Sequence, residues 1–183
     1  FKPIIQSISE IVEVEYDSQT ENGKMMNRIA DHVRAIIFCI SDGVLPGNEG
    51  RGYVERRLLR RAVRDGLKLG KEECFLYKLV PAIAEVMHDA YPEITKRREN
   101  ISRIIKNEEE RFHETLFMGS KRLDELMEGL RESGQKMLSG QDAFQLYDTF
   151  GFPFEITEST VTENNLTVDK DGFEREMEKQ REQ

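Results

Sequence analysis

Arginines are concentrated in one short stretch of this chain, where their side chains could bind phosphate. The segment 51–71, RGYVERRLLRRAVRDGLKLGK, holds eight basic and two acidic residues, so its net charge is +6. The whole chain carries −8, so the remaining residues together carry −14. A guanidinium group is planar, binds phosphate through paired hydrogen bonds and stacks on bases. A basic island on an acidic chain therefore indicates nucleic acid as one possible partner.

The spacing of these basic residues matches one face of a helix. At about 100° per residue, one arc about 140° wide holds Tyr53, Arg56, Arg57, Arg60, Arg61, Arg64, Lys68 and Lys71. The opposite arc is mostly apolar, with Val54, Leu58, Leu59, Ala62, Val63 and Leu69. We expect one face to pack on a core and the other to present arginines. Charge alone equally allows a solvated face that pairs with acidic neighbours such as Glu108, Glu109 and Glu110.

A glycine-rich loop, PGNEGRG at residues 46–52, comes immediately before this helix. Its three glycines let backbone amides approach a ligand closely, and a helix start offers free N–H groups. Asn48 carries both a donor and an acceptor, so it could read the edge of a base. The loop lacks the Gly-Lys-Ser/Thr ending of a P-loop, and no strand precedes it as in a dinucleotide fingerprint. Taken alone, it is also compatible with an ordinary turn.

A second informative segment is LYDTFGFP, residues 146–153, in which Asp148 lies between two aromatic residues and beside a Gly-Phe-Pro turn. A carboxylate in such a place is usually a helix cap or a structural acceptor. A functional role would need an exposed donor as its partner. Guanine's 2-amino group is the one base donor in the minor groove, and that groove is wide and shallow in RNA.

The sequence offers no catalytic centre and no metal-binding motif. His32, His88 and His113 show no ligand spacing with cysteine or acidic residues, and no nucleophile can be paired with a base. Segment 169–172, DKDG, lacks the spacing and the final Glu of a calcium loop, which makes a helix cap or turn the better interpretation. We therefore expect no catalytic residue and no metal ligand in this chain.

Composition places the chain among globular proteins rich in helix. It has 183 residues, of which 38% are hydrophobic and 34% charged. The two cysteines, Cys39 and Cys74, form neither a disulfide framework nor a paired metal motif, which indicates a reducing, cytoplasmic compartment. No apolar run approaches the roughly 20 residues that span a membrane, and no signal peptide is visible. The missing initiator Met suggests an excised fragment.

Apolar periodicity predicts an all-α protein, a helical bundle with a long amphipathic helix. Helices are expected over residues 3–15, 24–41, 52–69, 73–89, 93–138 (as one or two helices), 143–147 and 154–165, followed by a charged segment at 173–183. No convincing alternating strand appears. We expect one helical domain over residues 1–165 and a C-terminal helical segment over 166–183.

Two runs of sequence closely resemble the alanyl-tRNA synthetases. They are NRIADHVRAIIFCISDGVLPGNEGRGYVERRLLRRAVRDG and LYDTFGFP. The opening FKPIIQSI is similar to the stretch that follows the class II catalytic core in that family. The resemblance covers residues 1 to about 165, and about forty contiguous residues with one order and spacing make it highly specific.

The resemblance implies a function in recognising tRNA. The family attaches alanine to its tRNA with ATP and magnesium, and identifies the tRNA mainly by a G·U wobble pair in the acceptor stem. By motif match, Asn48 and Asp148 read that pair. The phosphate-contacting and stacking residues would then be Arg51, Tyr53, Arg56, Arg57, Arg60, Arg61, Arg64 and Lys68.

The chain also departs from the family pattern. The catalytic motifs for ATP and alanine are absent, as are the zinc-bearing editing domain and the C-terminal domain, which the resemblance makes partners within the parent protein. We therefore expect a fragment that needs no cofactor of its own and binds RNA without attaching alanine. Gly47 replaces a usual serine, and Glu55 replaces a commonly apolar residue on the apolar arc, which puts packing there in doubt. The alternative function is a helical interaction or linker module whose basic helix docks on an acidic protein.

Overall fold

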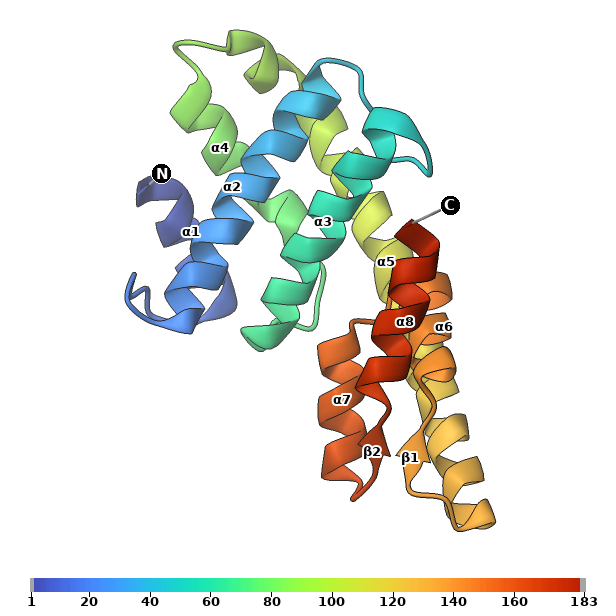
Figure 1. Cartoon of the computed structure of the whole chain (residues 1–183). Helices are drawn as coiled ribbons and strands as arrows, with labels where there is room; N and C mark the ends of the chain where they lie inside the picture. Colours follow the sequence, from blue (N-terminus) through green and yellow to red (C-terminus); the bar gives the residue numbers. More distant parts are fainter. Residues whose placement is uncertain (1, 182–183) are drawn as a thin grey trace. The chain divides into compact units, whose positions relative to one another are not determined.

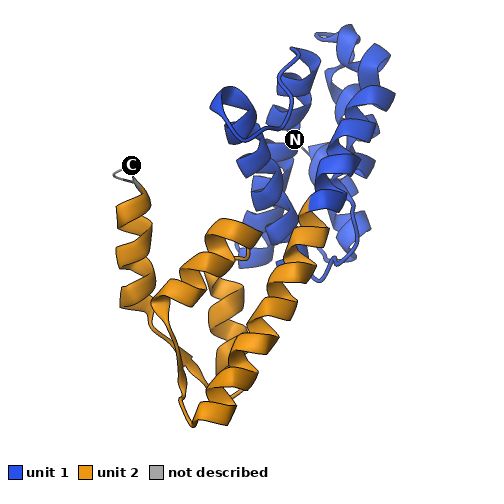
Figure 2. Cartoon of the chain, turned by 90° about the vertical axis from the view of Figure 1, so that its right-hand side faces the viewer, with its two compact units in different colours: residues 1–111 blue, residues 112–183 orange. Residues whose placement is uncertain are grey.

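The computed structural model describes residues 2–181 and confirms the all-α class (Figure 1). The chain divides into two compact units, residues 1–111 and 112–183 (Figure 2). Residues 182 and 183, at the end of the expected charged segment, lie outside the described residues. Among the described helices, none is both long and apolar enough to cross a membrane.

Unit 1 is a helical bundle built mainly on two long neighbouring helices. Its elements are α1 (Lys2–Val12), α2 (Glu21–Ser41), α3 (Gly50–Lys68), the 3-10 helix η1 (Leu76–Leu79), α4 (Val80–Met87) and the first part of α5 (Pro92–Ser133). α2 begins three residues earlier than expected, because the Thr20 side chain accepts a hydrogen bond from the backbone N–H of Gly23 and caps the helix. The single helix expected over 73–89 is instead η1 followed by α4.

The core of unit 1 lies where the apolar stripes of α2 and α3 meet, as their periodicity predicts. The two stripes bury Ile29, Val33, Ile36, Ile37, Leu59, Ala62 and Val63, each at most 1% exposed. An ion pair also joins the two helices: Arg28 Nε and Nη2 donate to the two carboxylate oxygens of Asp65 at 2.5 and 2.6 Å. α3 ends as expected before a glycine, since Gly70 adopts a φ of +88°.

Unit 2 contains the rest of α5, then β1 (Met137–Leu138), α6 (Gly140–Phe150), α7 (Phe154–Glu163), β2 (Thr167–Val168) and α8 (Lys170–Arg181). The expectation of no strand was wrong, because β1 and β2 form a parallel pair with Met137 opposite Thr167. Strands of two residues are too short to show alternation in a sequence. α5 is one continuous helix that ends at Ser133, and Gly134 follows with a φ of +71°.

The last helix is part of the packing of unit 2. α8 packs against α6, and the Phe173 ring stacks on Phe154, with ring centroids 4.3 Å apart. The expected cap at its start is present, since Asp169 Oδ1 accepts a hydrogen bond from the Gly172 N–H at 2.8 Å. The two compact units do not follow the boundary expected at residue 165. The assignment of residues 1–165 to one RNA-recognition domain stays a prediction.

Candidate nucleic-acid interface

The glycine loop before α3 has a defined backbone conformation. The N–H of Gly47 donates to the carbonyl of Gly52 at 2.9 Å, which closes the loop on itself. At Gly52 a Cβ atom would lie 2.4 Å from the carbonyl oxygen of Leu45, so any side chain there would force the loop apart. Gly50 has a φ of +57°, in the left-handed region that favours glycine. These contacts fix the backbone on both sides of Asn48.

Asn48 is exposed, and its side chain is held from one side. Nη1 of Arg56 donates a hydrogen bond to Oδ1 of Asn48. Arg56 is in turn held by Glu108 of α5: its Nε lies 2.6 Å from Oε1, and its Nη2 donates to Oε2 at 3.2 Å. The Glu108 side chain is 6% exposed and the Arg56 side chain 18%. Asn48, Arg56 and Glu108 thus form a chain of contacts from the loop into the core of unit 1.

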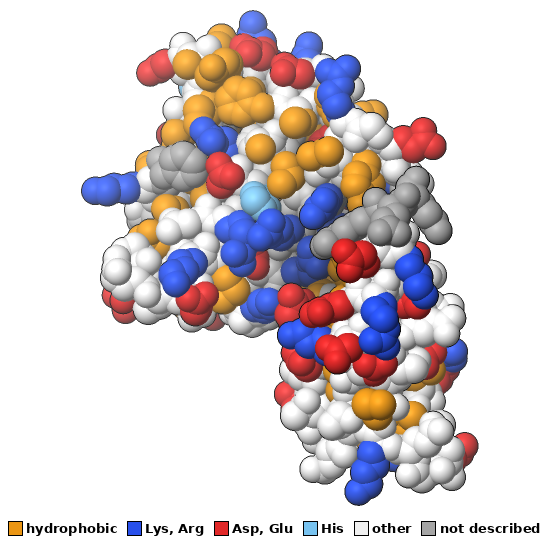
Figure 3. All heavy atoms as spheres, viewed as in Figure 1, with side chains coloured by type: hydrophobic (Ala, Val, Ile, Leu, Met, Phe, Trp, Pro, Cys, Tyr) orange, Lys and Arg blue, Asp and Glu red, His pale blue; other side chains and the backbone are white. Residues whose placement is uncertain are grey.

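The remaining basic side chains of α3 divide into free and engaged groups. Exposed residues without a side-chain hydrogen bond or ion pair within residues 2–181 are Arg51, Arg57, Arg61 and Lys68. The half-buried Arg60 and Arg64 both have interaction partners. Figure 3 shows Lys and Arg side chains gathered on the surface of unit 1 in the region of α3. Tyr53 is 51% exposed, so its ring is accessible to a ligand.

Two expectations about the faces of α3 were only partly right. Of the acidic neighbours considered as partners, Glu108 pairs with Arg56, but Glu110 pairs with Lys106 at 3.7 Å and Glu109 binds backbone donors. Val54, expected on the buried arc, is 56% exposed. Val54 lies in the second turn of α3. A helical projection gives the face on which a residue lies, but it does not show whether a neighbouring helix covers that part of the face.

Glu55 lies on the buried face of α3, as its position in the projection predicts. It is 1% exposed, and neither carboxylate oxygen has a hydrogen-bond partner among the described residues. Burial, and secondarily the negative charge of Glu108, raise the pKa of Glu55 to about 7. This carboxyl group is therefore a source of instability beside the Arg56–Glu108 pair.

Asp148 lies in unit 2, exposed on the last turn of α6. The helix ends there because Gly151 adopts a left-handed φ of +62°, and the Phe152 N–H donates a hydrogen bond to the carbonyl of Leu146. Asp148 does not cap this helix end; Oδ1 accepts a hydrogen bond from Nε2 of Gln180 at 2.5 Å. Asn48 and Asp148 belong to different units, and their convergence on one base pair stays a prediction.

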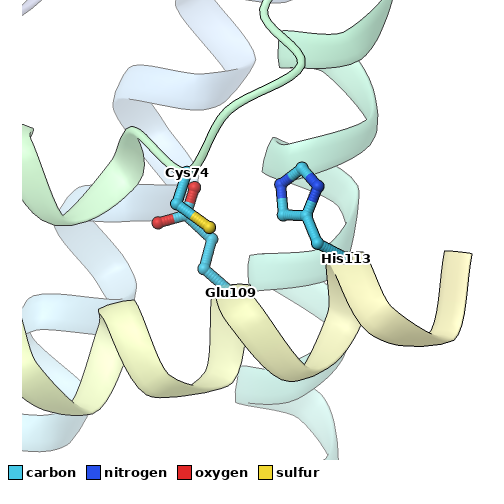
Figure 4. A group of neighbouring side chains, drawn as sticks. All are labelled: Cys74, Glu109 and His113. Atoms are coloured by element: carbon cyan, nitrogen blue, oxygen red, sulfur yellow. The ribbon is translucent and has the colours of Figure 1, made fainter. Parts of the chain in front are cut away.

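Three side chains that could serve as metal ligands lie near one another, and the expectation of no metal ligand stays a prediction. Cys74, Glu109 and His113 bring one ligand atom each to within 4.8 Å of one another (Figure 4). The Glu-x-x-x-His spacing on α5 is visible in the sequence, but Cys74 comes from a distant loop. Glu109 Oε1 accepts from the backbone N–H groups of Phe75 and Leu76 at 2.7 and 3.1 Å, which gives its burial a structural reason. We assign no metal to this group.

Comparison with known proteins places the chain in a family. The family model for tRNA synthetases class II (A) matches residues 1–183. The alanine–tRNA ligase of Geobacillus kaustophilus is 50% identical over 182 residues, which is 100% of this chain and 20% of that protein. Those of Bacillus cytotoxicus and Streptococcus pneumoniae are 50% and 48% identical, over 100% of this chain and 21% of each.

The chain thus spans about a fifth of the length of these relatives. Family model and relatives agree with the resemblance carried by the Asn48 loop and the LYDTFGFP segment. The chain therefore belongs to the class II (A) tRNA synthetase family and, within it, to the alanyl-tRNA synthetases.

Proposed function

We propose that this chain is the part of an alanine–tRNA ligase that recognises the acceptor stem of tRNA(Ala). The observation that carries the proposal is the set of exposed, unpaired cations on α3, the helix that begins just after the exposed Asn48 (among the described residues: Arg51, Arg57, Arg61 and Lys68). Phosphate contacts of this kind position a nucleic acid without reading its sequence. Sequence would be read by Asn48 and Asp148.

The position of Asp148 supports a role outside the stability of the fold. It lies in the last turn of α6, where the helix dipole disfavours a negative charge, and that turn contains no basic residue. A G·U wobble pair leaves the guanine 2-amino group free in the minor groove, where a carboxylate can accept its hydrogen bond. A G·C pair uses one N–H of this group for base pairing and shifts its position in the groove, so Asp148 would meet a poorly placed donor, at a cost of about 1–3 kcal/mol.

The activity of the whole ligase is part of the same proposal. The enzyme would attach alanine with ATP and Mg²⁺, and its catalytic, zinc-bearing editing and C-terminal domains would be partners of this segment. We expect the segment alone to bind RNA without attaching alanine. Cys39 and Cys74 are both free thiols, which agrees with a reducing compartment such as the cytoplasm.

The test is a binding titration of the full-length ligase with acceptor-stem hairpins that carry G·U or G·C. The unsubstituted ligase should prefer G·U by about tenfold or more, and Asp148→Asn should remove that preference. Arg57→Ala and Arg61→Ala should weaken both hairpins equally and lower the slope of log K against log salt by about 1 each.

Arg98→Ala, which removes an exposed arginine of α5, is the matched control and should change neither quantity. Equal affinity of the unsubstituted ligase for the two hairpins would refute the reading of G·U. An unchanged salt slope in both arginine variants would instead favour the alternative, a basic helix that docks on an acidic protein.

A further inference from the structure

We propose that Arg56 and Glu108 position Asn48 so that it faces RNA as a hydrogen-bond donor. The inference rests on the proposed function and assigns Arg56 a role different from that of the other arginines of α3. The sequence alone predicts that Arg56 contacts RNA along with its neighbours on α3. Its hydrogen bond to Asn48 and its pairing with a buried carboxylate indicate a positioning residue instead.

Glu108 anchors Arg56. Both oxygens of Glu108 are engaged by the guanidinium group, at 2.6 Å from Nε and 3.2 Å from Nη2. The Glu108 side chain is only 6% exposed, so this carboxylate could not stay buried without its cationic partner. An Arg56 that turned outward to meet a phosphate would give up both of its contacts with Glu108. The pair therefore keeps Arg56 on unit 1 and fixes the direction of its remaining nitrogen, Nη1.

Arg56 determines the orientation of the Asn48 amide. A guanidinium group has only donors, so the amide atom that faces Nη1 of Arg56 must be the oxygen, Oδ1. The amide nitrogen, Nδ2, then points away from Arg56, and no hydrogen bond within residues 2–181 engages it. Two N–H groups are thus available on an exposed side chain. The matching group on RNA is an acceptor, such as a base carbonyl oxygen.

The backbone that carries Asn48 is also restrained. The Gly47–Gly52 hydrogen bond closes the loop, and Gly52 packs closely against the backbone of Leu45. With the side chain also held by Arg56, the donor needs little reorganisation when RNA binds. Preorganisation of this kind improves discrimination, because a poorly placed acceptor cannot be met by a movement of the loop.

The decisive variants are Arg56→Lys and Asn48→Asp in the full-length ligase. Lysine keeps the charge but cannot bind Glu108 and Asn48 through one planar fork. We expect Arg56→Lys to reduce the preference for G·U over G·C hairpins by about tenfold, with an unchanged salt slope. Asn48→Asp keeps an oxygen toward Arg56 and replaces the outward donor by an acceptor, so it should lose at least as much preference as Asn48→Ala.

A double variant separates positioning from a general structural effect. If Arg56 acts through Asn48, then Arg56→Lys should cause no further loss of preference in an Asn48→Ala background. Additive losses would overturn the proposal, as would a fall of about 1 in the salt slope with the preference retained in Arg56→Lys. If Arg56→Lys does not fold, retention of the G·U preference by Asn48→Asp would be sufficient to refute it. Failure of the unsubstituted ligase to prefer G·U would instead refute the proposed function.

Discussion

Replacement of Glu55 by methionine should stabilise the protein, and more so at alkaline than at acidic pH. Glu55 is 1% exposed, and its carboxylate oxygens have no hydrogen-bond partner among the described residues. Burial raises its pKa from 4.5 to about 7, and the charge of Glu108 adds to this. One pKa unit corresponds to about 1.4 kcal/mol, so the charged form costs about 3 kcal/mol.

The sign of the pH dependence follows from proton binding in the two states. The unfolded chain releases the proton of Glu55 near pH 4.5, and the folded chain near pH 7. Between these values the folded state binds more protons, so stability falls as pH rises, and it levels off above pH 7. Methionine has a similar length and no charge. The gain from Glu55→Met should therefore be about 3 kcal/mol at pH 8 and distinctly smaller at pH 5.

The assay is urea unfolding of both proteins at several pH values between 5 and 8. Glu109, whose pKa is also raised to about 7, titrates in both proteins, so its contribution largely cancels in the difference. Glu99→Met, on an exposed position of α5, is the matched control and should change stability by less than about 0.5 kcal/mol. An equal gain at pH 5 and pH 8 would show that packing, not charge, is responsible. A loss of stability at pH 8 would refute the reasoning entirely.

Two further predictions concern the packing of the helices. Asp65→Asn should destabilise the protein by about 1–3 kcal/mol in urea unfolding, because it removes the negative charge that pairs with the partly exposed Arg28. The double change Arg28→Met with Asp65→Leu should cost less, and an equal cost would contradict that explanation. Gly66→Ala should cost about 1–3 kcal/mol, since its Cβ would lie 2.3 Å from the Phe75 ring. Gly129→Ala, with no atom within 4 Å, should instead stabilise α5 by about 0.5–1 kcal/mol, and a loss in both would show that ring contact is not the cause.

The sequence predicts the parts of this fold that depend on helical period. The stripes of α2 and α3 are buried where the spacing places them, from Ile29 to Val63. A helical projection treats each helix alone, however, so it could not show that Arg28 of α2 forms an ion pair with Asp65 of α3. For the same reason the sequence did not predict β1 and β2, because each strand is defined by a partner about thirty residues away and not by a local pattern.

The candidate site was predictable in its residue types but not in its contacts. The sequence singled out Asn48, Asp148 and the arginines of α3, whose exposure the structure now describes. It treated Arg56 as one of a uniform stripe, because a projection of α3 leaves out the loop that folds back toward it. Glu108 was one of three equivalent acids in the sequence. Only its place on α5 makes it the partner of Arg56.

The acidic remainder of the chain has a consequence for how RNA would be bound. Segment 51–71 carries +6, but the rest of the sequence carries −14. The attraction of exposed cations such as Arg57 and Arg61 extends over about 8–10 Å at physiological salt, whereas acidic surface elsewhere repels phosphate over the same range. A uniformly basic protein would bind RNA in many orientations. Under the proposed function, an arginine face on an acidic chain would disfavour the other orientations, so charge would restrict the orientation of the stem before any base is read.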